Sequence, residues 1–366
     1  RGDFESIESI PDAAFQALLL QNIDPGNILN PDDCSVTKRT QGSYHYCAVL
    51  NIKNLGSYVI KVPAIGTPAL WCEGDAHNLR GEARTMEYIR RQTSIPVPEV
   101  LCWDDTLSNP IGAPYIIMRV VEGKPAYKLW LDGRRPHHST ADMPSPELAK
   151  KRREFLRELA NTIAELQHLR FDKIGMLDFD DIDGTPKIGH YWIDDGHGQM
   201  KLRPAYSSSE EYFQAKLVAH IVDEDDDSSD LVWGRRNFMK YFYDSHPFSR
   251  SSSDAKETFV LAHNDLDLQN ILVDDSGKIT GIIDWDLTVT VPRCIGYASL
   301  PLFLQEDWNE NYDMESACHM PWSLDYYRSL YAEYMADATR NSSTGAFGDG
   351  KYTRKSHIYQ AADAAM

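Results

Sequence analysis

This chain of 366 residues is short of basic residues and has no long apolar run. Lys and Arg together number 37 against 55 Asp and Glu, so the formal net charge is -18. A nucleic-acid-binding surface needs clustered Lys and Arg to contact phosphates, and an anionic membrane attracts the same positive charge. We therefore expect neither nucleic acid nor a membrane as a partner. An acidic surface suits a cationic ligand, although solubility explains the same charge.

Closely spaced cysteines are also missing. The six cysteines are scattered, with no C-x-x-C pair and no close Cys/His group, which argues against a zinc cluster and a disulfide framework. The N-terminal stretch RGDFESIESIPDAAF is charged and contains no apolar signal core. No apolar run approaches the length that spans a bilayer. We expect reduced thiols and a cytoplasmic protein.

Strand patterns dominate the first third of the chain. Hydrophobic residues make up 42% of the sequence, which is typical of a globular protein, and the length favours two lobes over one core. Ser35–Ile52 alternates around a turn at Gln41–Ser43 and predicts a hairpin, and Ser57–Pro63 predicts a further strand. Helical spacing runs from Asn78 to Thr93. Two more strands are predicted within residues 95–105 and 113–123.

The remainder of the chain is mainly helical. Pro146–Leu169 carries the strongest helical pattern, with apolar residues on one face and charged residues on the other. Residues 180–209 are rich in Gly and Asp and predict irregular structure or a small hairpin, and the acidic run 223–230 predicts a mobile, solvated loop. We predict an α+β, bilobal protein with a β-rich N-terminal lobe containing one main helix (1–119) and a larger, mainly helical C-terminal lobe (120–366).

The stretch LAHNDLDLQNILVDDSGKITGIIDWD, Leu261–Asp286, places carboxylates beside apolar segments. Its DDSG turn signal predicts a hairpin that brings Asn270 and Asp284 together, with Asp265 on the loop before them. The order H-x-D-L-x-x-x-N followed by an Asp at a strand end is the catalytic and metal-binding signature of protein kinases. Asp265 would accept or orient the proton of an attacking hydroxyl, and Asn270 and Asp284 would supply the hard oxygen ligands that Mg²⁺ prefers.

A lysine in an apolar strand supplies the other half of this chemistry. Lys61 lies within YVIKVP, where a lysine is costly unless it is paired, and Glu82 on the following helix can pair with it. Such a pair would hold the α- and β-phosphates of a nucleotide. The alternative is a partly exposed lysine on an edge strand. Met118 ends an apolar strand, and backbone groups from Arg119 to Val121 at the lobe junction are candidates for binding adenine.

Together these segments resemble the aminoglycoside phosphotransferase and choline kinase superfamily, which has a bilobal, protein-kinase-like fold. The matching pieces lie in the family's order over residues 35–300 and are TQGSYHYCAVL, YVIKVP, GEARTMEYIRRQTSIPVPEVL, PYIIMRVVEGKP, IAELQHLRFDKIGML, HNDLDLQNILVD and ITGIIDWD. The resemblance implies ATP and Mg²⁺ as cofactors and transfer of the γ-phosphate to a small-molecule hydroxyl, aminoglycoside-like, amino-alcohol or other polyol. It also implies roles for site residues: Asp265 in catalysis, Asn270 and Asp284 in metal binding, and Lys61 with its partner Glu82 in phosphate binding.

Further positions either match or depart from the family pattern. Gly42 and Ser43 match the turn that covers the phosphates, although this turn holds one glycine instead of G-x-G-x-x-G. His263 matches the structural histidine of the catalytic loop. Asp267 stands where many relatives have His, and a carboxylate there cannot donate a hydrogen bond to the γ-phosphate. Gln269 replaces the frequent glycine before the metal-binding asparagine.

The acceptor is not identified by the sequence, and two other functions remain open. One is a catalytically silent nucleotide-binding or scaffold protein of the same fold. The other is a protein kinase, which is disfavoured because the segment after Asp284 contains neither D-F-G nor A-P-E. Trp285, Asp286 and Trp308 are candidates for an acceptor-binding wall, with packing as the alternative role of the two tryptophans. Asp267 is the rival of Asp265 as the catalytic carboxylate.

Overall fold

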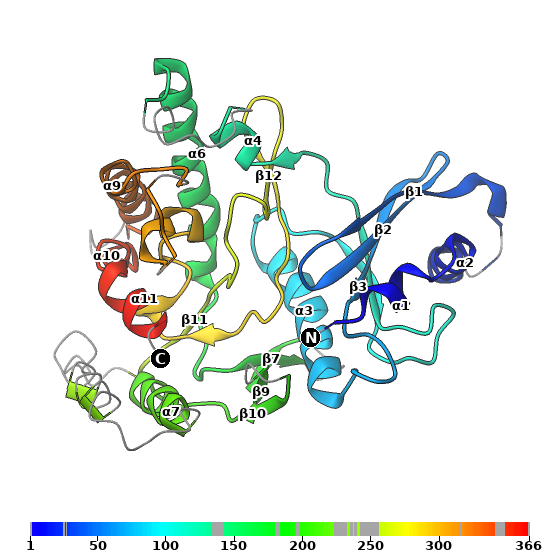
Figure 1. Cartoon of the computed structure of the whole chain (residues 1–366), viewed down its shortest axis with the longest axis horizontal. Coiled ribbons are helices and arrows are strands. Elements are labelled where there is room, and N and C mark those ends of the chain that lie inside the picture. The colour runs from blue at the N-terminus through cyan, green and yellow to red at the C-terminus, as the bar shows by residue number, and fades with distance from the viewer. Residues whose placement is uncertain are drawn as a thin grey trace.

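A computed structural model gives the arrangement of most of the chain (Figure 1). It describes residues 2–132 except 25 and 27, 143–179, 184–194, 198–222, 256–309, 311–314, 317–340 and 348–364, with single positions between 233 and 241. The acidic run predicted as a loop, 223–230, lies outside the described residues. Across the part of the chain that the structure describes, no helix has both the length and the apolar character that a membrane span requires.

A five-stranded antiparallel sheet forms the centre of the N-terminal lobe, in the order β1-β2-β3-β5-β4. The predicted hairpin and strands are present with small shifts of their ends, as β1 Cys34–Gln41, β2 His45–Ile52, β3 Gly56–Pro63, β4 Val100–Asp104 and β5 Tyr115–Arg119. Gly42 closes the turn between the first two strands by donating its backbone N–H to the carbonyl of His45 at 2.8 Å.

The two faces of this sheet contact different cores. Ile60 and Val62 of β3 pack in an outer core with Phe15 of α2 (Asp12–Ile23), which is preceded by α1 (Phe4–Glu8). Because side chains alternate along a strand, Lys61 points to the opposite, inner face. Neither α1 nor α2 was expected from the sequence, since α1 is very short and the apolar side chains of α2 are not confined to one stripe.

The main helix of the N-terminal lobe is α3, Glu73–Gln92, and it lies against the inner face of the sheet (Figure 1). The prediction placed its start at Asn78, five residues later than observed. The difference comes from a capping box in which Asp75 accepts a hydrogen bond from the backbone N–H of Cys72 at 3.1 Å. This C-x-x-D sequence performs the task usually done by S/T-x-x-E.

Helices make up most of the C-terminal lobe. They are α4 Tyr127–Trp130, α6 Pro146–Ala164, α7 Ser209–Val222, α9 Pro321–Ala338, α10 Gly350–Thr353 and α11 Ser356–Ala364. The amphipathic helix α6 packs lengthwise on α9 (Figure 1). Arg152 of α6 is buried because it donates from Nε and Nη2 to the carbonyl of Trp130, at 2.9 and 2.7 Å, and from Nη1 to the hydroxyl of Tyr327 at 3.0 Å. The predicted α+β, bilobal fold class is confirmed.

Short strands carry the catalytic stretch. β12 (Ile271–Val273) pairs with β13 (Ile279–Ile282) as the predicted hairpin, and β6 (Lys124–Pro125) adds to the other side of β12. β11 (Val260–Leu261) leads into the catalytic loop and pairs with β14 (Thr290–Val291). The chain thus joins a sheet of the C-terminal lobe at Lys124; the exact lobe boundary at residues 119–120 stays a prediction.

Two small hairpins occupy the region predicted as irregular or as one hairpin. The first pairs β7 (Met176–Phe179) with β8 (Pro186–Gly189), and the second pairs β9 (Tyr191–Asp194) with β10 (Met200–Arg203). In Figure 1 these green strands lie beside the cyan helix α3, and β7, β9 and β10 all contact it. A segment from the middle of the chain is therefore packed on the main helix of the first lobe.

Candidate active site

The predicted pair between the strand lysine and the helix glutamate is formed. Lys61 Nζ lies 2.7 Å from Glu82 Oε1, and the two residues are only 7% and 4% exposed. The edge-strand alternative for Lys61 is excluded, because β3 is the middle strand of the five. A buried lysine of this kind retains its charge only if it is paired, and the sheet and α3 bring its partner into place.

The same lysine contacts Asp284, which is 223 residues away in the sequence. Lys61 Nζ and Asp284 Oδ1 are 2.7 Å apart. Burial lowers the pKa of Lys61, but the charges of Glu82 and Asp284 outweigh it and hold the pKa above its ordinary value. Burial likewise raises the pKa of Asp284, and Lys61 outweighs this effect and holds the pKa below its usual range. Lys61 and Asp284 are thus favoured as charged species, whereas at Glu82 burial outweighs the charge of Lys61 and raises the pKa to about 7.

Asp284 lies at a bend in the chain just after β13. Its φ of 64° is in the left-handed region, which a non-glycine residue adopts only where the surroundings enforce it. The backbone N–H of Ile283 donates to the carbonyl of Asn270 at 2.9 Å. The hairpin thereby places Asn270 beside Asp284, as the DDSG turn signal predicts.

The catalytic loop is organised around Asp265. Asn270 Nδ2 donates to Asp265 Oδ2 at 2.7 Å and to its carbonyl at 3.0 Å. His263 Nδ1 accepts from the backbone N–H of Asp265 at 3.2 Å, and its Nε2 lies 3.0 Å from the carbonyl of Ile283. Burial lowers the pKa of His263, so the ring is neutral and carries its proton on Nε2. His263 therefore links the loop to the strand before Asp284, the structural role that its family match implies.

The side chains of Asn270 and Asp284 fit a magnesium ion. The amide nitrogen of Asn270 bonds to Asp265, which turns its side-chain oxygen the other way. Among the described residues, no three or more His, Cys, Asp or Glu side chains are grouped to hold a metal ion by themselves. Mg²⁺ commonly uses one or two protein ligands together with substrate phosphates and water. An amide oxygen and a carboxylate are of the kind that such a shared site requires.

The predicted nucleotide-binding positions are less closely gathered than the charged residues. Gly42 and Ser43 form the exposed turn between β1 and β2, and Met118 is buried in the core. Arg119 directs its guanidinium over the ring of Tyr58, 5.1 Å from the centroid, so its side chain turns to the outer face.

The junction between the lobes already uses some of its backbone donors. The N–H groups of Arg119 and Val120 donate within the protein, to the carbonyls of Glu99 and Ser57, both at 3.0 Å. Val121 packs against Gly281 of β13, where an added Cβ would lie 2.5 Å from Val121 Cγ1. Adenine binding at this junction stays a prediction.

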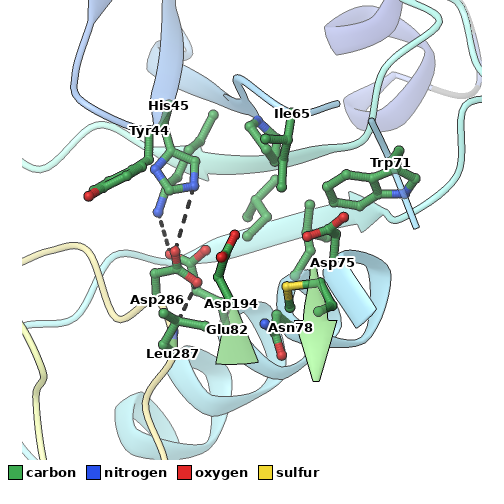
Figure 2. A pocket seen from close by; sticks show the side chains of 15 residues that line it. Tyr44, His45, Ile65, Trp71, Asp75, Asn78, Glu82, Asp194, Asp286 and Leu287 are labelled. Atoms are coloured by element: carbon green, nitrogen blue, oxygen red, sulfur yellow. Dashed lines mark hydrogen bonds and ion pairs between the residues drawn. The ribbon is translucent and has the colours of Figure 1, made fainter. Parts of the chain in front are cut away.

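A cavity of about 310 Å³ opens beside Lys61, between β3, α3 and the segment after Asp284 (Figure 2). Four carboxylates line it, and apolar walls separate them; the carboxylates are Asp75, Glu82, Asp194 and Asp286. Sequence reasoning identified Glu82 as the partner of Lys61 and Asp286 as a candidate for an acceptor-binding wall, but it did not place the two together. It missed Asp194 and Asp75, because nothing in the sequence indicates that the β9–β10 hairpin reaches α3.

His45 was also missed, although it directly follows the phosphate turn. Its Nε2 lies 3.9 Å from Asp286 Oδ2, as the dashed lines in Figure 2 indicate. Burial lowers the pKa of His45 to about 3, so the ring is neutral and the contact is not an ion pair at neutral pH. Burial raises the pKa of Asp286.

The proposed aromatic wall is not formed. Trp285 has 0% exposure, donates from Nε1 to the carbonyl of Ile282 at 2.9 Å and therefore packs in the core. Trp308 lies under the guanidinium of Arg328, 5.2 Å from the ring centroid, and lines a different cavity. Of the three candidates for this wall, Asp286 alone lines the cavity beside Lys61.

Asp267 faces surroundings different from those of Asp265. It lines a second cavity of about 410 Å³ together with Tyr127, Glu306 and His319. Its Oδ1 accepts from the backbone N–H of Leu268 at 2.8 Å. Burial raises the pKa of both Asp267 and Glu306. The two loop aspartates thus have different side-chain partners, and the expectation that they point differently agrees with this.

The family model described as the phosphotransferase enzyme family matches residues 49–315, which include the lysine strand, the catalytic loop and Asp284. The chain belongs to the phosphotransferase enzyme family. Membership agrees with the resemblance seen in the sequence motifs and shows a kinase-type transferase.

Curated relatives of this phosphotransferase match it over limited stretches. It is 26% identical over 167 residues to altered inheritance of mitochondria protein 9, mitochondrial, of Candida glabrata, covering 41% of this chain and 25% of that protein. It is 33% identical over 105 residues to a subtelomeric hrmA-associated cluster protein of Aspergillus fumigatus, covering 28% of this chain and 19% of that protein. The chain thus spans a quarter or less of the length of these relatives.

Solved structures of similar proteins cover nearly the whole phosphotransferase. Aminoglycoside phosphotransferase APH(4)-Ia is 16% identical, with 97% of this chain and 98% of that chain covered and a TM-score of 0.49. The macrolide 2'-phosphotransferase MphH of Brachybacterium faecium is 14% identical, with 96% and 90% covered and a TM-score of 0.47. Neither likeness adds to what the family match shows.

Proposed function

We propose that this phosphotransferase moves the γ-phosphate of ATP to a hydroxyl group of a small molecule, with Mg²⁺ as its metal cofactor. The observation that supports this most directly is the position of Lys61 between Glu82 and Asp284, at 2.7 Å from each. Lysine, helix glutamate and strand-end aspartate are the parts that phosphoryl transfer uses to hold a nucleotide and its metal. Their presence also argues against a catalytically silent protein.

The site residues divide the tasks of the reaction in this proposal. Lys61 binds the α- and β-phosphates, and Glu82 holds the lysine in position. Asn270 and Asp284 bind Mg²⁺, which when present neutralises the charge on the phosphate oxygens. Asp265 orients the acceptor hydroxyl and accepts its proton, and its hydrogen bond from Asn270 keeps the carboxylate directed to that position.

The acceptor in this proposal is a small molecule that carries a positive charge. The cavity of Asp267 and Glu306 adjoins the catalytic loop, and its volume of about 410 Å³ is in the range of small-molecule sites. A cationic group would stabilise the ionised forms of these two carboxylates, whose pKa values are raised by burial. A protein substrate is disfavoured, since the segment after Asp284 lacks D-F-G and A-P-E. The cytoplasmic location stays a prediction.

A phosphate-transfer assay separates the alternatives. The protein is incubated with Mg²⁺ and γ-labelled ATP against aminoglycosides, amino alcohols, neutral polyols and a peptide library, with Lys61→Ala as the control. Label on an amino-bearing small molecule, absent with Lys61→Ala, is the expected result. Label on peptides would overturn the proposal, and nucleotide binding without transfer to any acceptor would favour the silent alternative.

A further inference from the structure

The helix that carries Glu82 is packed on two opposite sides. Its Ala83 and Met86 are buried on the side of the N-terminal sheet, with Glu82 directed to Lys61. The opposite side contacts β7, β9 and β10, which belong to the two hairpins of residues 176–203 (Figure 1). We call these two hairpins the α3 clamp.

Two glycines of α3 allow the clamp to approach closely. Gly74 and Gly81 are seven residues apart, which is close to two helical turns, so they lie on the same face. A Cβ added at Gly81 would lie 2.3 Å from Met176 Sδ, and one added at Gly74 would lie 2.9 Å from the ring carbon Cδ2 of Trp192. Glycine inside a helix costs stability relative to alanine. The close contact with the clamp, and not helix propensity, therefore explains glycine at these two positions.

Polar and ring contacts join the same surfaces. Asn78 lies between the two glycines on this face, and its Nδ2 donates to the carbonyl of Trp192 at 3.2 Å. The rings of His77 and His190 are stacked, with centroids 4.7 Å apart and planes at 23°. Contacts between α3 and the clamp therefore extend along the helix axis, which restrains both its sliding and its rotation.

We infer that the α3 clamp is a positioning element that holds Glu82 against Lys61 and thereby sets the nucleotide affinity of the site. The inference rests on the proposed function for its nucleotide. Glu82 directly follows Gly81, so a helix displaced at Gly81 moves the carboxylate away from the lysine. Met176 and Trp192 act through α3 and touch neither Lys61 nor Asp284, so they are positioning residues. Met200 of the same clamp lines the cavity beside Lys61, so the clamp reaches the site itself.

Gly81→Ala tests this inference, because the added methyl group collides with the buried side chain of Met176 and forces the contact between helix and clamp to change. Alanine favours a helix over glycine, so α3 by itself would gain stability from the change. If the clamp positions Glu82, AMP-PNP with Mg²⁺ should nevertheless bind roughly tenfold more weakly, the size of effect typical of residues in contact. Amide hydrogen exchange of α3 in the nucleotide-free protein should also be faster than in the wild type.

A compensating substitution and a matched control make the test specific. Met176→Ala in the Gly81→Ala background removes the collision, and it should restore AMP-PNP affinity and the slow exchange of α3. Gly189→Ala is the control, because it lies on the same hairpin and its Cβ would meet Asp178 Cβ at an ordinary 3.6 Å. It should change neither measurement. For a chain that does not fold with Gly81→Ala, Trp192→Ala provides the same two measurements on a residue that is partly exposed.

Two results would overturn the positioning role. One is an unchanged exchange rate of α3 and unchanged AMP-PNP affinity in Gly81→Ala or, where that variant does not fold, in Trp192→Ala. The other is a Gly81→Ala/Met176→Ala protein that binds AMP-PNP no better than Gly81→Ala alone. Failure of the proposed function has a different signature: the wild type would bind no AMP-PNP, whereas α3 exchange would still respond to the clamp variants.

Discussion

Two groups of carboxylates flank the catalytic loop, and they differ in whether a cation is buried among them. Glu82 and Asp284 both contact Lys61 at 2.7 Å. Asp267 and Glu306 share the other cavity, in which no Lys or Arg is found among the described lining residues. Burial acts on both groups in the same direction, because it raises the pKa of a carboxylate wherever water is partly excluded.

The result for ionisation nevertheless differs between Asp284 and Asp267, although burial raises the pKa of Glu82 in the first group to about 7. The pKa of Asp284 is held below its ordinary range because Lys61 outweighs burial, whereas burial raises the pKa of Asp267 and Asp265 adds to the rise. One site therefore has a cation that the protein itself supplies, whereas the other has none among its described lining residues. A role can therefore be assigned to a partly buried carboxylate only when the cation nearest to it is known.

Substituting each loop aspartate in turn should give the largest difference in activity between the two regions. Asp265→Ala should lower the rate of phosphate transfer by ~10²–10⁴, the usual contribution of a positioned general base, and should leave MgATP binding nearly unchanged. Asp267→Ala should lower the rate less, because this side chain faces the other cavity. Transfer rates at saturating acceptor and ATP affinities measure both effects. An equal or larger loss for Asp267→Ala would show that the catalytic carboxylate is assigned to the wrong residue.

Lys61→Met should remove the cation that distinguishes the first group of carboxylates from the second. It leaves Glu82 and Asp284 buried without their cation, and breaking a buried ion pair from one side costs about 3–5 kcal/mol of the free energy of unfolding. ATP binding should weaken, and chemical denaturation should show the loss of stability. Glu82→Gln provides the comparison, since it removes the helix carboxylate but keeps the lysine and its Asp284 contact. Unchanged ATP affinity in Lys61→Met would contradict the assigned role of this lysine.

A pH change should affect the second region through His319. Trp130 Nε1 donates to His319 Nε2 at 2.7 Å, and burial lowers the pKa of His319 to about 3. The unfolded chain binds a proton below its ordinary pKa near 6.5, so this group lowers stability as the pH falls from about 6.5 towards 3. Between pH 7 and pH 5 the free energy of unfolding should fall by ~2 kcal/mol from this residue. His319→Gln should remove that part of the pH dependence of the free energy of unfolding, which denaturation curves at several pH values measure. An unaltered pH dependence would refute this role of His319.

Asn270→Ala should have the smallest lasting effect, because it removes one metal ligand and leaves the charge of Asp284 and Lys61 in place. Activity should fall at low Mg²⁺ and recover in part when Mg²⁺ or Mn²⁺ is in excess. Asp284→Asn is the matched comparison, since it removes the charge and should recover less. Identical metal dependence of the wild type and both variants would mean that the β12–β13 hairpin does not form the metal site.

The catalytic loop and its hairpin could be predicted because their chemistry is local in sequence. Asp265, Asn270 and Asp284 lie within twenty residues, and a turn signal between two apolar runs brings the last two together. Lys61 and Glu82 could be paired because a lysine in an apolar strand demands a partner from the next helix. The α3 clamp could not be predicted in this way, since its partners are about a hundred residues apart and their contact depends on two glycines that have no signal of their own.

The sequence was sufficient to predict the main strands of the N-terminal lobe, the helices α3 and α6, the residues of the phosphoryl-transfer motif and the family that the motifs resemble, because strand alternation, helical spacing and turn residues act over a few positions. The tertiary structure alone decided that Trp285 packs in the core, that Asp267 and Asp265 face different surroundings, and that His45, Asp75 and Asp194 lie around Lys61. These outcomes depend on how deeply each side chain is buried and on how far each carboxylate lies from a cation. Both depend on how the two lobes and the α3 clamp pack together, which no short stretch of sequence records.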